Sequence, residues 1–455
     1  MLEKYKGKKI LIAGFGVEGR ATFEFLKKHG IKADIADVID EDAFFEVNPE
    51  LKNDKVGFIF GKNYLNSTGN YDVVFRAPGI SPLTPELKSV VSKGTEITSQ
   101  IKIFLELCPA KTIGVTGTKG KGTTSTLIYK ILKASGKDVY LGGNIGVPAI
   151  SLLDKLNRDS IVVLELSSFQ LMDLEKSPNI AVVLNVTSEH LDYHKDREEY
   201  VEAKSPIVKY QTADDFAVIN TDYETPREFK KETKAEIYEI SIQNPVENGC
   251  YVSKNDDIVL CIKDTEEKIA STSELQLRGR HNLENVCPAL AVAYIAGADL
   301  GSIKKTVKEF KGLEHRLEFV AEVDGVKYYN DSFATTPEAT IAAVSAFHEP
   351  VILIAGGSEK GSDYTQMGTV IAEKVKTVFL IGDTAEEIKN NILSVDPSAD
   401  IREGFTDMDD LVGRASEAAK IGDVVVLSPG CASFGLFENY KKRGEIFKEA
   451  ARNLK

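Results

Sequence analysis

The sequence predicts an α/β protein with three domains, each built on a mainly parallel sheet. Short apolar runs typical of buried strands alternate along the chain with longer stretches of helical apolar spacing, the pattern of parallel strands joined by helices. The chain has 455 residues, of which 42% are hydrophobic, and this suits about three domains of ~100–200 residues each. We expect these domains to span residues 1–108, 109–312 and 313–455.

The N-terminal domain begins with a buried strand that leads into a glycine-rich turn and a helix. Residues Lys8–Thr22 contain the pattern G-x-G-x-x-G, and the acidic pair Asp34 and Asp37 follows about 20 residues later. This arrangement indicates a Rossmann-like domain that sets a diphosphate against a helix N-terminus. The motif alone fits an NAD-dependent oxidoreductase, or any other domain that binds a nucleotide diphosphate in this way.

A second loop of this domain follows the predicted strand Tyr71–Phe75. Residues Arg76–Pro82 come after the carboxyl end of that strand, where open α/β sheets bind ligands. The pair Pro78 and Gly79 is also typical of a simple turn, and the residues alone do not distinguish the two interpretations. Residues Leu107–Lys111 contain a proline and end the apolar pattern, so they predict the linker to the second domain.

The central domain opens with a predicted phosphate-binding loop, which indicates a parallel sheet of the P-loop ATPase kind. An apolar run from Thr112 leads into the glycine-rich turn Gly117–Thr124, and a helix is expected from about Thr123. Backbone N–H groups of such a turn surround an anion, Lys121 would reach the terminal phosphates, and the Thr123 hydroxyl would hold a magnesium ion. Gly122 separates the lysine from the threonine, unlike the standard spelling. The alternative is an ordinary glycine-rich turn with a solvated lysine.

Two polar residues stand out in the segments that follow the phosphate loop. Asn144 lies in a glycine-rich loop and can hydrogen-bond a ligand. Glu165 lies in the apolar strand Ile161–Gln170, and a buried carboxylate needs a partner. A magnesium ion beside the phosphate loop would supply that partner. The alternative is a glutamate at the strand end that faces solvent.

Two further residues of the central domain have no clear role when considered singly. His190 comes just after the predicted strand Ile180–Val186, at the edge where ligands bind, but a lone histidine is usually structural. Lys204 lies among apolar neighbours in a helix predicted over Glu198–Tyr210. A lysine in that position is most often solvated or extends its charged end to the surface.

The third domain again alternates strands and helices, which predicts a second Rossmann-like sheet. Its expected strands are Lys327–Asn330, Pro350–Ala355, Thr377–Ile381 and Asp423–Ser428. The loops Asn330–Pro337, Gly356–Asp363 and Ser428–Gly435 follow three of these strands and would share one edge of the sheet. They supply hydroxyls, backbone N–H groups and the cation of Lys360, which suits an anionic amino acid. The alternative is that they are only turns.

Composition limits the partners and the compartment. The formal net charge of −13 makes nucleic acid a poor electrostatic match. The five cysteines lack C-x-x-C spacing, which argues for a reducing compartment and against a zinc site. The N-terminus does not resemble a signal peptide, and no apolar run approaches the ~18 residues of a membrane helix. We therefore expect a soluble, cytoplasmic monomer that neither binds nucleic acid nor inserts into membranes.

Several segments together resemble the Mur ligases and the related folylpolyglutamate synthases. Gly117–Thr124, Leu164–Gln170, Leu184–Asp192 and the pair Ala203–Lys204 occur in the order and approximate spacing of the Mur ligase central domain. The pair His315–Arg316 and the loops of the third domain extend the resemblance over nearly the whole chain. The folate branch lacks the N-terminal domain, so its presence favours a peptidoglycan ligase.

The resemblance implies an ATP-dependent amide ligase that acts through an acyl phosphate in peptidoglycan precursor synthesis, and so in cell-wall growth, cell shape and cell division. Residues 164–170 and 428–433 are most like the branch that adds D-glutamate to UDP-N-acetylmuramoyl-L-alanine. The implied small-molecule partners are ATP, glutamate and this UDP-sugar. The implied cofactors are two Mg²⁺ ions and a carbamylated lysine.

Carried over from the family, functional roles fall on positions in all three domains. The ATP-binding residues would be Gly117, Thr118, Lys119, Gly120, Lys121, Gly122, Thr123, Thr124, Asn282, Arg316 and Asp331. The metal ligands would be Thr123 and Glu165 for one ion, and His190 and carbamylated Lys204 for the other, with Lys121, His190 and Lys204 as the catalytic residues. The UDP-sugar would contact Gly14, Phe15, Gly16, Asp37, Pro78, Gly79 and Asn144, and glutamate would contact Thr335, Lys360, Ser433 and Tyr440.

Two residues depart from the family pattern near the amino-acid pocket. Phe333 stands where the family usually has lysine, and Gly435 where it usually has aspartate. A less common relative that adds L-glutamate to the same precursor also has an apolar residue in the first of these loops. The alternative functions are therefore an L-glutamate-adding ligase and, from another class, an NAD-dependent oxidoreductase.

Overall fold

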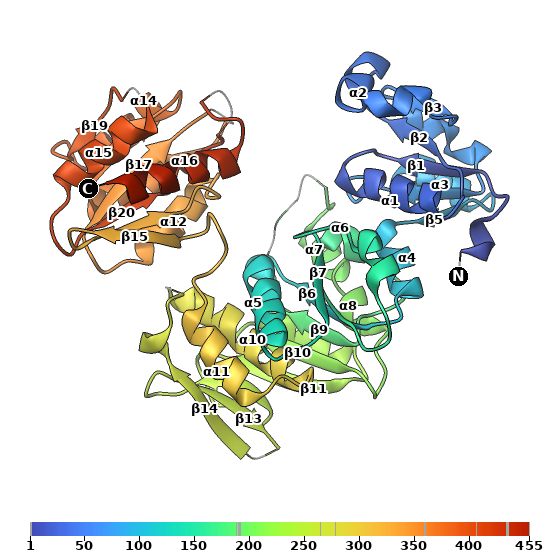
Figure 1. Cartoon of the computed structure of the whole chain (residues 1–455), viewed down its shortest axis with the longest axis horizontal. Helices are drawn as coiled ribbons and strands as arrows, with labels where there is room; N and C mark the ends of the chain where they lie inside the picture. Colours follow the sequence, from blue (N-terminus) through green and yellow to red (C-terminus); the bar gives the residue numbers. More distant parts are fainter. Residues whose placement is uncertain are drawn as a thin grey trace. The chain divides into compact units, whose positions relative to one another are not determined.

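The computed structural model contains three α/β sheets along the chain (Figure 1). It describes residues 2–187, 189, 193–263, 265–277, 279–358, 361–405, 407–433 and 436–454. Two compact units make up the chain: Met1–Glu274 with Leu283–Lys308, and Leu275–Asn282 with Glu309–Lys455. The first unit contains the first two sheets and the second unit contains the third, so the predicted three-domain α/β fold class is confirmed.

The N-terminal sheet is fully parallel, with the strand order β3-β2-β1-β4-β5. Its strands are β1 (Ile10–Ala13), β2 (Asp34–Asp37), β3 (Phe58–Phe60), β4 (Val73–Arg76) and β5 (Glu96–Thr98). Its helices are α1 (Val17–Lys28), α2 (Glu41–Val47), α3 (Pro85–Val91) and α4 (Gln100–Leu107). Strands β1 and β4 are neighbours, so the two predicted ligand loops follow adjacent strands at one edge.

The central sheet has nine strands in the order β14-β13-β12-β11-β10-β9-β6-β8-β7. The strands are β6 (Lys111–Thr116), β7 (Val139–Gly143), β8 (Ile161–Glu165), β9 (Ile180–Val183), β10 (Phe216–Asn220), β11 (Glu236–Ser241), β12 (Gly249–Val252), β13 (Asp257–Ile262) and β14 (Thr265–Ser271). All neighbouring pairs from β7 to β12 are parallel, whereas β13 and β14 add an antiparallel extension.

Helices of this part of the chain are mostly short. They are α5 (Lys121–Ala134), α6 (Ser168–Leu171), α7 (Arg197–Glu202), α8 (Pro206–Lys209), α9 (Glu224–Glu228), α10 (Leu283–Ile295) and α11 (Leu300–Glu309). The helix predicted over residues 198–210 is wrong, because two helices, α7 and α8, replace it. Pro206 is the first residue of α8, a position where its missing N–H costs no hydrogen bond, while inside one long helix it would break the ladder.

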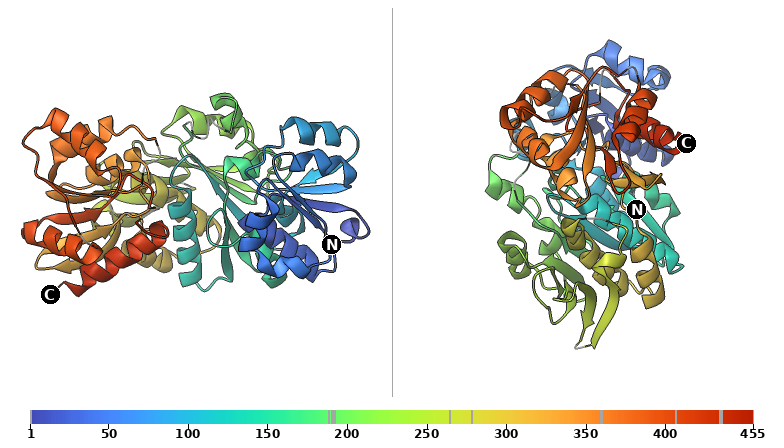
Figure 2. Two further views of the ribbon diagram at one scale, coloured as in Figure 1. Left: turned by 90° about the horizontal axis from the view of Figure 1, so that it is seen from above. Right: turned by 90° about the vertical axis from the view of Figure 1, so that its left-hand side faces the viewer.

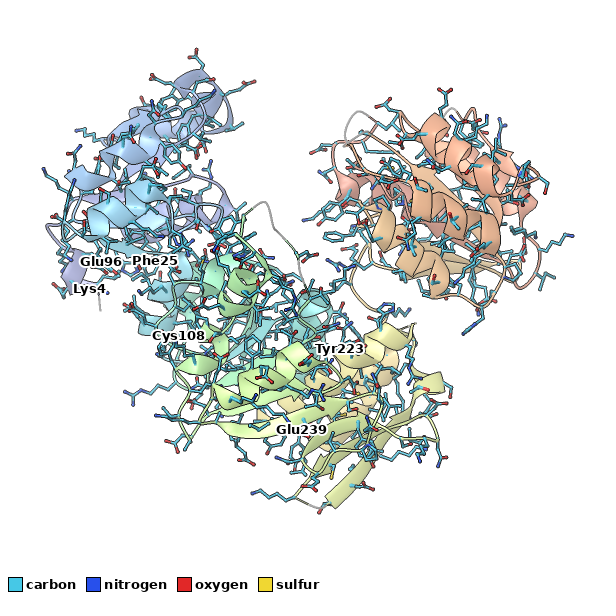
Figure 3. All side chains as sticks on the ribbon, turned by 180° about the vertical axis from the view of Figure 1, so that it is seen from behind. Lys4, Phe25, Glu96, Cys108, Tyr223 and Glu239 are labelled. Atoms are coloured by element: carbon cyan, nitrogen blue, oxygen red, sulfur yellow. The ribbon has the colours of Figure 1, made fainter. Side chains whose placement is uncertain are left out.

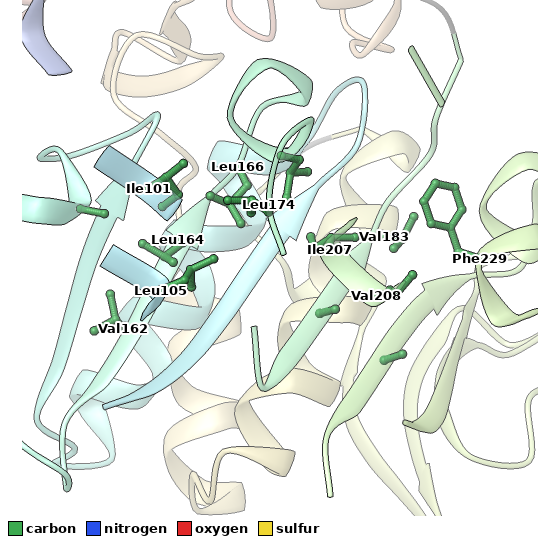
Figure 4. Close-up of a cluster of buried hydrophobic side chains, with 14 of the residues drawn as sticks. Ile101, Leu105, Val162, Leu164, Leu166, Leu174, Val183, Ile207, Val208 and Phe229 are labelled. Carbon is green, nitrogen blue, oxygen red and sulfur yellow. The ribbon is translucent and has the colours of Figure 1, made fainter. Parts of the chain in front are cut away.

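The core of the central sheet also receives side chains from helix α4. Figure 4 shows Ile101 and Leu105 of α4 packed near Val162 and Leu164 of β8. Ile103 of the same helix belongs to the hydrophobic core of the N-terminal sheet. Helix α4 therefore packs into both cores, which accounts for the close packing of the first two sheets in one unit.

The third sheet has the order β15-β16-β20-β17-β18-β19. Its strands are β15 (Glu318–Val323), β16 (Val326–Asn330), β17 (Val351–Gly356), β18 (Val375–Ile381), β19 (Ile401–Arg402) and β20 (Val424–Leu427). Its helices are α12 (Pro337–Ser345), α13 (Thr365–Lys374), α14 (Ala385–Val395), α15 (Met408–Ala418) and α16 (Tyr440–Asn453). Helices α15 and α16 pack on one face and α12 to α14 on the other, so the sheet lies between two helical layers (Figure 2).

The surface carries many charged side chains in pairs of opposite sign. Lys4 lies beside Glu96, with Nζ 3.6 Å from its carboxylate, and 2.9 Å from that of Glu106 (Figure 3). Such half-exposed pairs add little stability. Among the helices of the described residues, none is both long enough and apolar enough to cross a lipid bilayer.

The third sheet depends on one buried cation of helix α16. Arg443 has no exposed surface, and burial lowers its pKa to about 10. Its guanidinium donates to the Ser332 hydroxyl at 3.0 Å and to the Ser332 carbonyl at 2.9 Å. It also donates to the carbonyls of Cys431 and Ala432 at 3.2–3.4 Å. Arg443 therefore joins the loops that follow β16 and β20.

Replacing Arg443 should destabilise the second unit. In Arg443→Ala several buried carbonyls lose their donors, so we expect the free energy of unfolding to fall by roughly 3 kcal/mol. Urea denaturation with hydrogen exchange of β16 and β20 measures this change. The control Lys442→Ala removes a half-exposed lysine from the same helix and should change stability little. Equal effects of the two substitutions would contradict the role of Arg443.

Candidate active site

The predicted phosphate loop leads from the end of β6 into helix α5, which begins at Lys121, two residues before the expected start. Gly120 has φ +87°, and a side chain there would collide with the Asn285 amide. At Gly117, φ is +154° and an added Cβ would lie 2.7 Å from the Cβ of Leu184. The loop therefore requires glycine at both positions for conformation and for space.

The segment that follows strand β9 holds the phosphate loop through hydrogen bonds to Thr118. The Thr118 N–H donates to the Asn185 carbonyl at 2.8 Å, and the Thr187 N–H donates to the Thr118 hydroxyl at 2.9 Å. That hydroxyl also lies 3.1 Å from the hydroxyl of Tyr200. Lys121 bends back over the loop, where its ammonium donates to the carbonyls of Gly117 at 3.0 Å and Thr118 at 2.8 Å.

Glu165 lies at the end of β8, beside the phosphate loop. It is 7% exposed, so the alternative of a glutamate facing solvent is wrong. Strand β8 pairs with β6 and β7, which places Glu165 opposite Val115 and Gly143. The side-chain amide of Asn144 donates to its carboxylate at 3.0 Å. The strand order thus brings Asn144, which the sequence assigned to the UDP-sugar, into contact with the predicted metal ligand.

Lys204 is a buried lysine rather than the solvated one that its helix position alone suggests. It is 2% exposed, and its ammonium lies 3.4 Å from the Gly117 carbonyl and 4.4 Å from the centre of the Tyr200 ring. Burial lowers the pKa of Lys204 well below its usual value, the charge of Lys121 lowers it further, and Glu189 opposes the shift. The amine therefore loses its proton unusually easily, at the base of the phosphate loop.

The two predicted loops of the N-terminal sheet contact each other. A Cβ added to Gly14, where φ is +85°, would lie 2.7 Å from the Cβ of Ala77. The Asp37 carboxylate accepts from the Phe15 N–H at 2.6 Å and so fixes the turn before Gly16. The loop Gly14–Gly16 and the loop that carries Pro78 and Gly79 thus form one surface at the carboxyl edge of this sheet.

In the second unit, three loops share one edge of the sheet, as the sequence predicted. The strands β16, β20 and β17 that precede them are parallel neighbours. The Gly430 N–H donates to the Ala334 carbonyl at 2.9 Å, and the Ser358 N–H to the Ala432 carbonyl at 3.0 Å. These bonds join the segments that carry Thr335 and Ser433.

Asp331 is the most perturbed carboxyl group of this edge. It is 8% exposed, and burial raises its pKa to about 7. The Ser428 hydroxyl donates to it at 2.8 Å and the Leu317 N–H at 3.1 Å, and the charge of Arg316 also favours its ionised form. Strongly perturbed groups of this kind are concentrated at functional sites.

Phe333, the first departure from the family pattern, is 38% exposed and lies between two other side chains. The Arg316 guanidinium lies 4.0 Å from the centre of its ring, and the Tyr440 ring meets it edge-on at 4.9 Å. The positive charge of Arg316 therefore lies over Phe333, the residue that replaces the usual lysine of the family. His190, Lys360 and Gly435 lie outside the described residues.

The residues present fit ATP and magnesium. The loop leads into the N-terminus of a 14-residue helix, where backbone N–H groups can bind an anion, and its left-handed glycines fit closely against Leu184 and Asn285. Thr123, in the first turn of helix α5, offers a hydroxyl, and Glu165, at the end of β8, offers a carboxylate; oxygen ligands are those that Mg²⁺ prefers.

Fold and site together define an enzyme class: a multidomain protein with a nucleotide-binding phosphate loop at the carboxyl edge of a parallel sheet. Three family models match the chain. They describe a MurD-like N-terminal domain of Mur ligases over residues 8–99, the Mur ligase middle domain over 115–293, and the Mur ligase glutamate ligase domain over 315–431. The chain belongs to the Mur ligase family, which leaves the oxidoreductase alternative without support.

Curated relatives match over nearly the whole chain. The UDP-N-acetylmuramoylalanine–D-glutamate ligase of Acetivibrio thermocellus is 41% identical over 457 residues, which cover 99% of this chain and 98% of that protein. The enzyme of the same name from Clostridium kluyveri is 39% identical over 452 residues, which cover 99% and 97%.

Solved structures of other Mur ligases share the fold. The UDP-N-acetylmuramate–alanine ligase of Thermotoga maritima has a TM-score of 0.58 at 15% identity, covering 98% of this chain and 99% of that one. MurF of Acinetobacter baumannii has a TM-score of 0.60 at 15% identity, covering 88% and 83%.

Sequence reasoning missed some residues that organise the site. Tyr200 supports the phosphate loop through Thr118, and Arg443 joins two loops of the third sheet. Arg76 was noticed only as the first residue of a loop, yet it is almost fully buried. A charged residue at the end of an apolar strand is a signal that could have singled it out.

The raised pKa of Asp331 predicts a particular dependence of stability on pH. Between about pH 4 and pH 7 the folded chain keeps a proton that the unfolded chain has lost, so this contribution to stability falls as the pH rises. Relative to Asp331→Asn, the wild-type free energy of unfolding should fall by up to about 1.4 kcal/mol per pH unit in this window. Urea denaturation at a series of pH values measures the difference.

The matched control is Asp409→Asn, which changes an exposed aspartate of helix α15 in the same unit. Its stability should follow the wild-type pH curve. If the free energy of unfolding of Asp331→Asn also followed the wild-type pH curve, Asp331 would already be ionised in the folded chain.

Proposed function

We propose that this protein is an ATP-dependent ligase that adds D-glutamate to UDP-N-acetylmuramoyl-L-alanine. The observation that carries the proposal is the identity of about 40% over nearly the full length with ligases of that name. The phosphate loop, buried Glu165 and buried Lys204 support the proposal, because they would supply the chemistry that such an activity needs.

The three predicted domains would each contribute one substrate. Residues 1–108 would bind the UDP-sugar through the contacting loops at Gly14 and Pro78, residues 109–312 would bind ATP, and residues 313–455 would bind glutamate. Asn282, Arg316 and Asp331 would also bind the nucleotide.

The reaction would proceed in two steps. The alanine carboxylate of the UDP-sugar attacks the γ-phosphorus of ATP, which forms an acyl phosphate and releases ADP. The amine of glutamate then attacks the acyl carbon, an amide bond forms, phosphate leaves and the amine loses a proton. Lys121 and the loop N–H groups spread the charge of the triphosphate, and much of the rate comes from orientation of the reactants.

Two magnesium ions would be bound by Thr123 and Glu165, and by His190 and carbamylated Lys204. Bound metal would screen the repulsion between the attacking carboxylate and the triphosphate. The lowered pKa of Lys204 supports carbamylation, because only the neutral amine adds to CO₂. That addition forms an N–C bond, releases a proton, and converts a cation that would repel Mg²⁺ into an oxygen ligand.

The amino acid would be bound by Thr335, Lys360, Ser433 and Tyr440. Phe333 replaces a lysine nearby, but the Arg316 guanidinium on its ring keeps a positive charge at this loop. This charge supports an anionic amino acid and leaves L-glutamate as the alternative substrate. We further propose a cytoplasmic monomer without nucleic-acid partners, consistent with the net charge of −13.

The first experiment is phosphate release from ATP, Mg²⁺ and UDP-N-acetylmuramoyl-L-alanine with D-glutamate and L-glutamate in parallel. We expect release with D-glutamate, with Phe333 a tolerated variation in the pocket. Release with L-glutamate alone would leave the proposed metal chemistry in place and would show that the product contains L-glutamate instead of D-glutamate. No release with either amino acid would overturn the proposed function.

The role of Lys204 predicts chemical rescue. Lys204→Ala should lose ligase activity by a factor on the order of 100 or more, because a metal ligand is removed. Millimolar acetate or formate should restore part of it by occupying the place of the carbamate. Lys209→Ala, at an exposed lysine one helix later, is the control and should keep activity. Full activity of Lys204→Ala without additive would refute this role.

A further inference from the structure

Arg76, the last residue of strand β4, makes a set of contacts that joins the first two sheets. Its side chain is completely buried. Nε and Nη2 donate to the two carboxylate oxygens of Asp173, at 2.9 and 2.6 Å. Nη1 donates to the Ile80 carbonyl at 3.1 Å, and Nη2 also donates to the Phe169 carbonyl at 3.0 Å. One guanidinium thus binds its own loop on one side and the central sheet on the other.

The segment that receives Arg76 directly follows the predicted metal ligand. Helix α6 begins three residues after Glu165, and Asp173 lies just beyond its end. A capping box fixes the start of this helix: Gln170 N–H donates to the Ser167 hydroxyl, and the Gln170 side chain accepts from the Ser167 N–H. The segment is therefore a rigid continuation of β8.

A second contact holds the same N-terminal loop. The Tyr193 hydroxyl donates to the Pro78 carbonyl at 2.9 Å, and its ring lies 4.2 Å from that of Phe169. The backbone from Ala77 to Ile80 is thus bound to the central sheet at Pro78 through Tyr193 and at Ile80 through Arg76. Pro78 and Gly79 are the residues assigned to the UDP-sugar.

Arginine suits this place for geometric reasons. A buried charge needs a partner, and the planar guanidinium offers five donors in a fixed fork that can serve a carboxylate and two carbonyls together. A buried ion pair of this kind contributes little net stability compared with apolar packing, but it fixes one geometry. By contrast, Lys28 and Asp154 join the same two parts of the chain through an exposed pair at 2.5 Å.

We propose that Arg76 is a positioning residue of the ligase reaction, which through Asp173 fixes the UDP-sugar loop, residues 77–80, against the strand end that carries Glu165. This proposal rests on the proposed function. The attacking carboxylate belongs to the UDP-sugar, while the triphosphate lies on the central sheet. Their relative placement therefore depends on this contact, and small misplacements of reacting groups are costly.

The decisive variant is the double substitution Arg76→Met with Asp173→Leu, which removes both charges and leaves no unpaired buried ion. We expect kcat to fall roughly 100-fold and KM for the UDP-sugar to rise, with KM for ATP unchanged. Arg76→Lys keeps the positive charge but loses the planar fork of donors. We expect its kcat to lie between those of the wild type and the double variant. The control Asp154→Asn breaks the exposed pair and should leave all three constants unchanged.

Hydrogen exchange of the full chain gives a readout that does not depend on activity. Amides of residues 77–82 should exchange faster in the double variant, and at the wild-type rate in Asp154→Asn. A lowered melting temperature with unchanged kinetic constants and unchanged exchange would overturn the positioning role and leave a structural one. Absence of phosphate release from the wild-type protein would instead overturn the proposed function on which this role rests.

Discussion

The carboxyl ends of adjacent parallel strands carry most of the predicted site. In the central sheet, β7, β8, β6 and β9 are consecutive neighbours, and their ends carry Asn144, Glu165, the phosphate loop and Asn185. In the third sheet, β16, β20 and β17 bring three loops together in the same way. The helices that follow such strands direct their N-termini to this edge, which favours anion binding there.

Buried cations are the second feature that these sheets have in common, and each one is stabilised differently. Arg443 is surrounded by backbone carbonyls and joins two loops of the third sheet. Arg76 is paired with a carboxylate and joins two sheets of the first unit. Lys204 lies against the Gly117 carbonyl and the Tyr200 ring, and burial and the charge of Lys121 lower its pKa, although Glu189 opposes the shift. Burial disfavours the charged form of an amine, so Lys204 loses its proton more easily than an exposed lysine does, which makes it chemically different from the two arginines.

Local patterns predicted much of the fold. Apolar runs and glycine positions, which act over a few residues, predicted strands β16, β17, β18 and β20, the glycine turn before α5 and the shared edge of three loops. Strands β15 and β19 of the same sheet were not predicted. The errors also have local causes. Pro206 divides the helix predicted over residues 198–210 into α7 and α8. The antiparallel extension β13–β14 was not predicted. Buried and exposed residues do not alternate regularly along these two strands, and the register between them shifts between Ile258 and Val259.

The sequence by itself determined the family, the α/β class and most of the residues at the strand ends, because strand–glycine–helix motifs are encoded by neighbouring residues. Only the tertiary structure decided which charged residues are buried and what they contact. Lys204 reaches the carbonyl of Gly117, 87 positions earlier, and Arg76 pairs with Asp173, 97 positions later. Burial and partnership at such separations depend on how whole sheets pack, and no local pattern of residues contains that information.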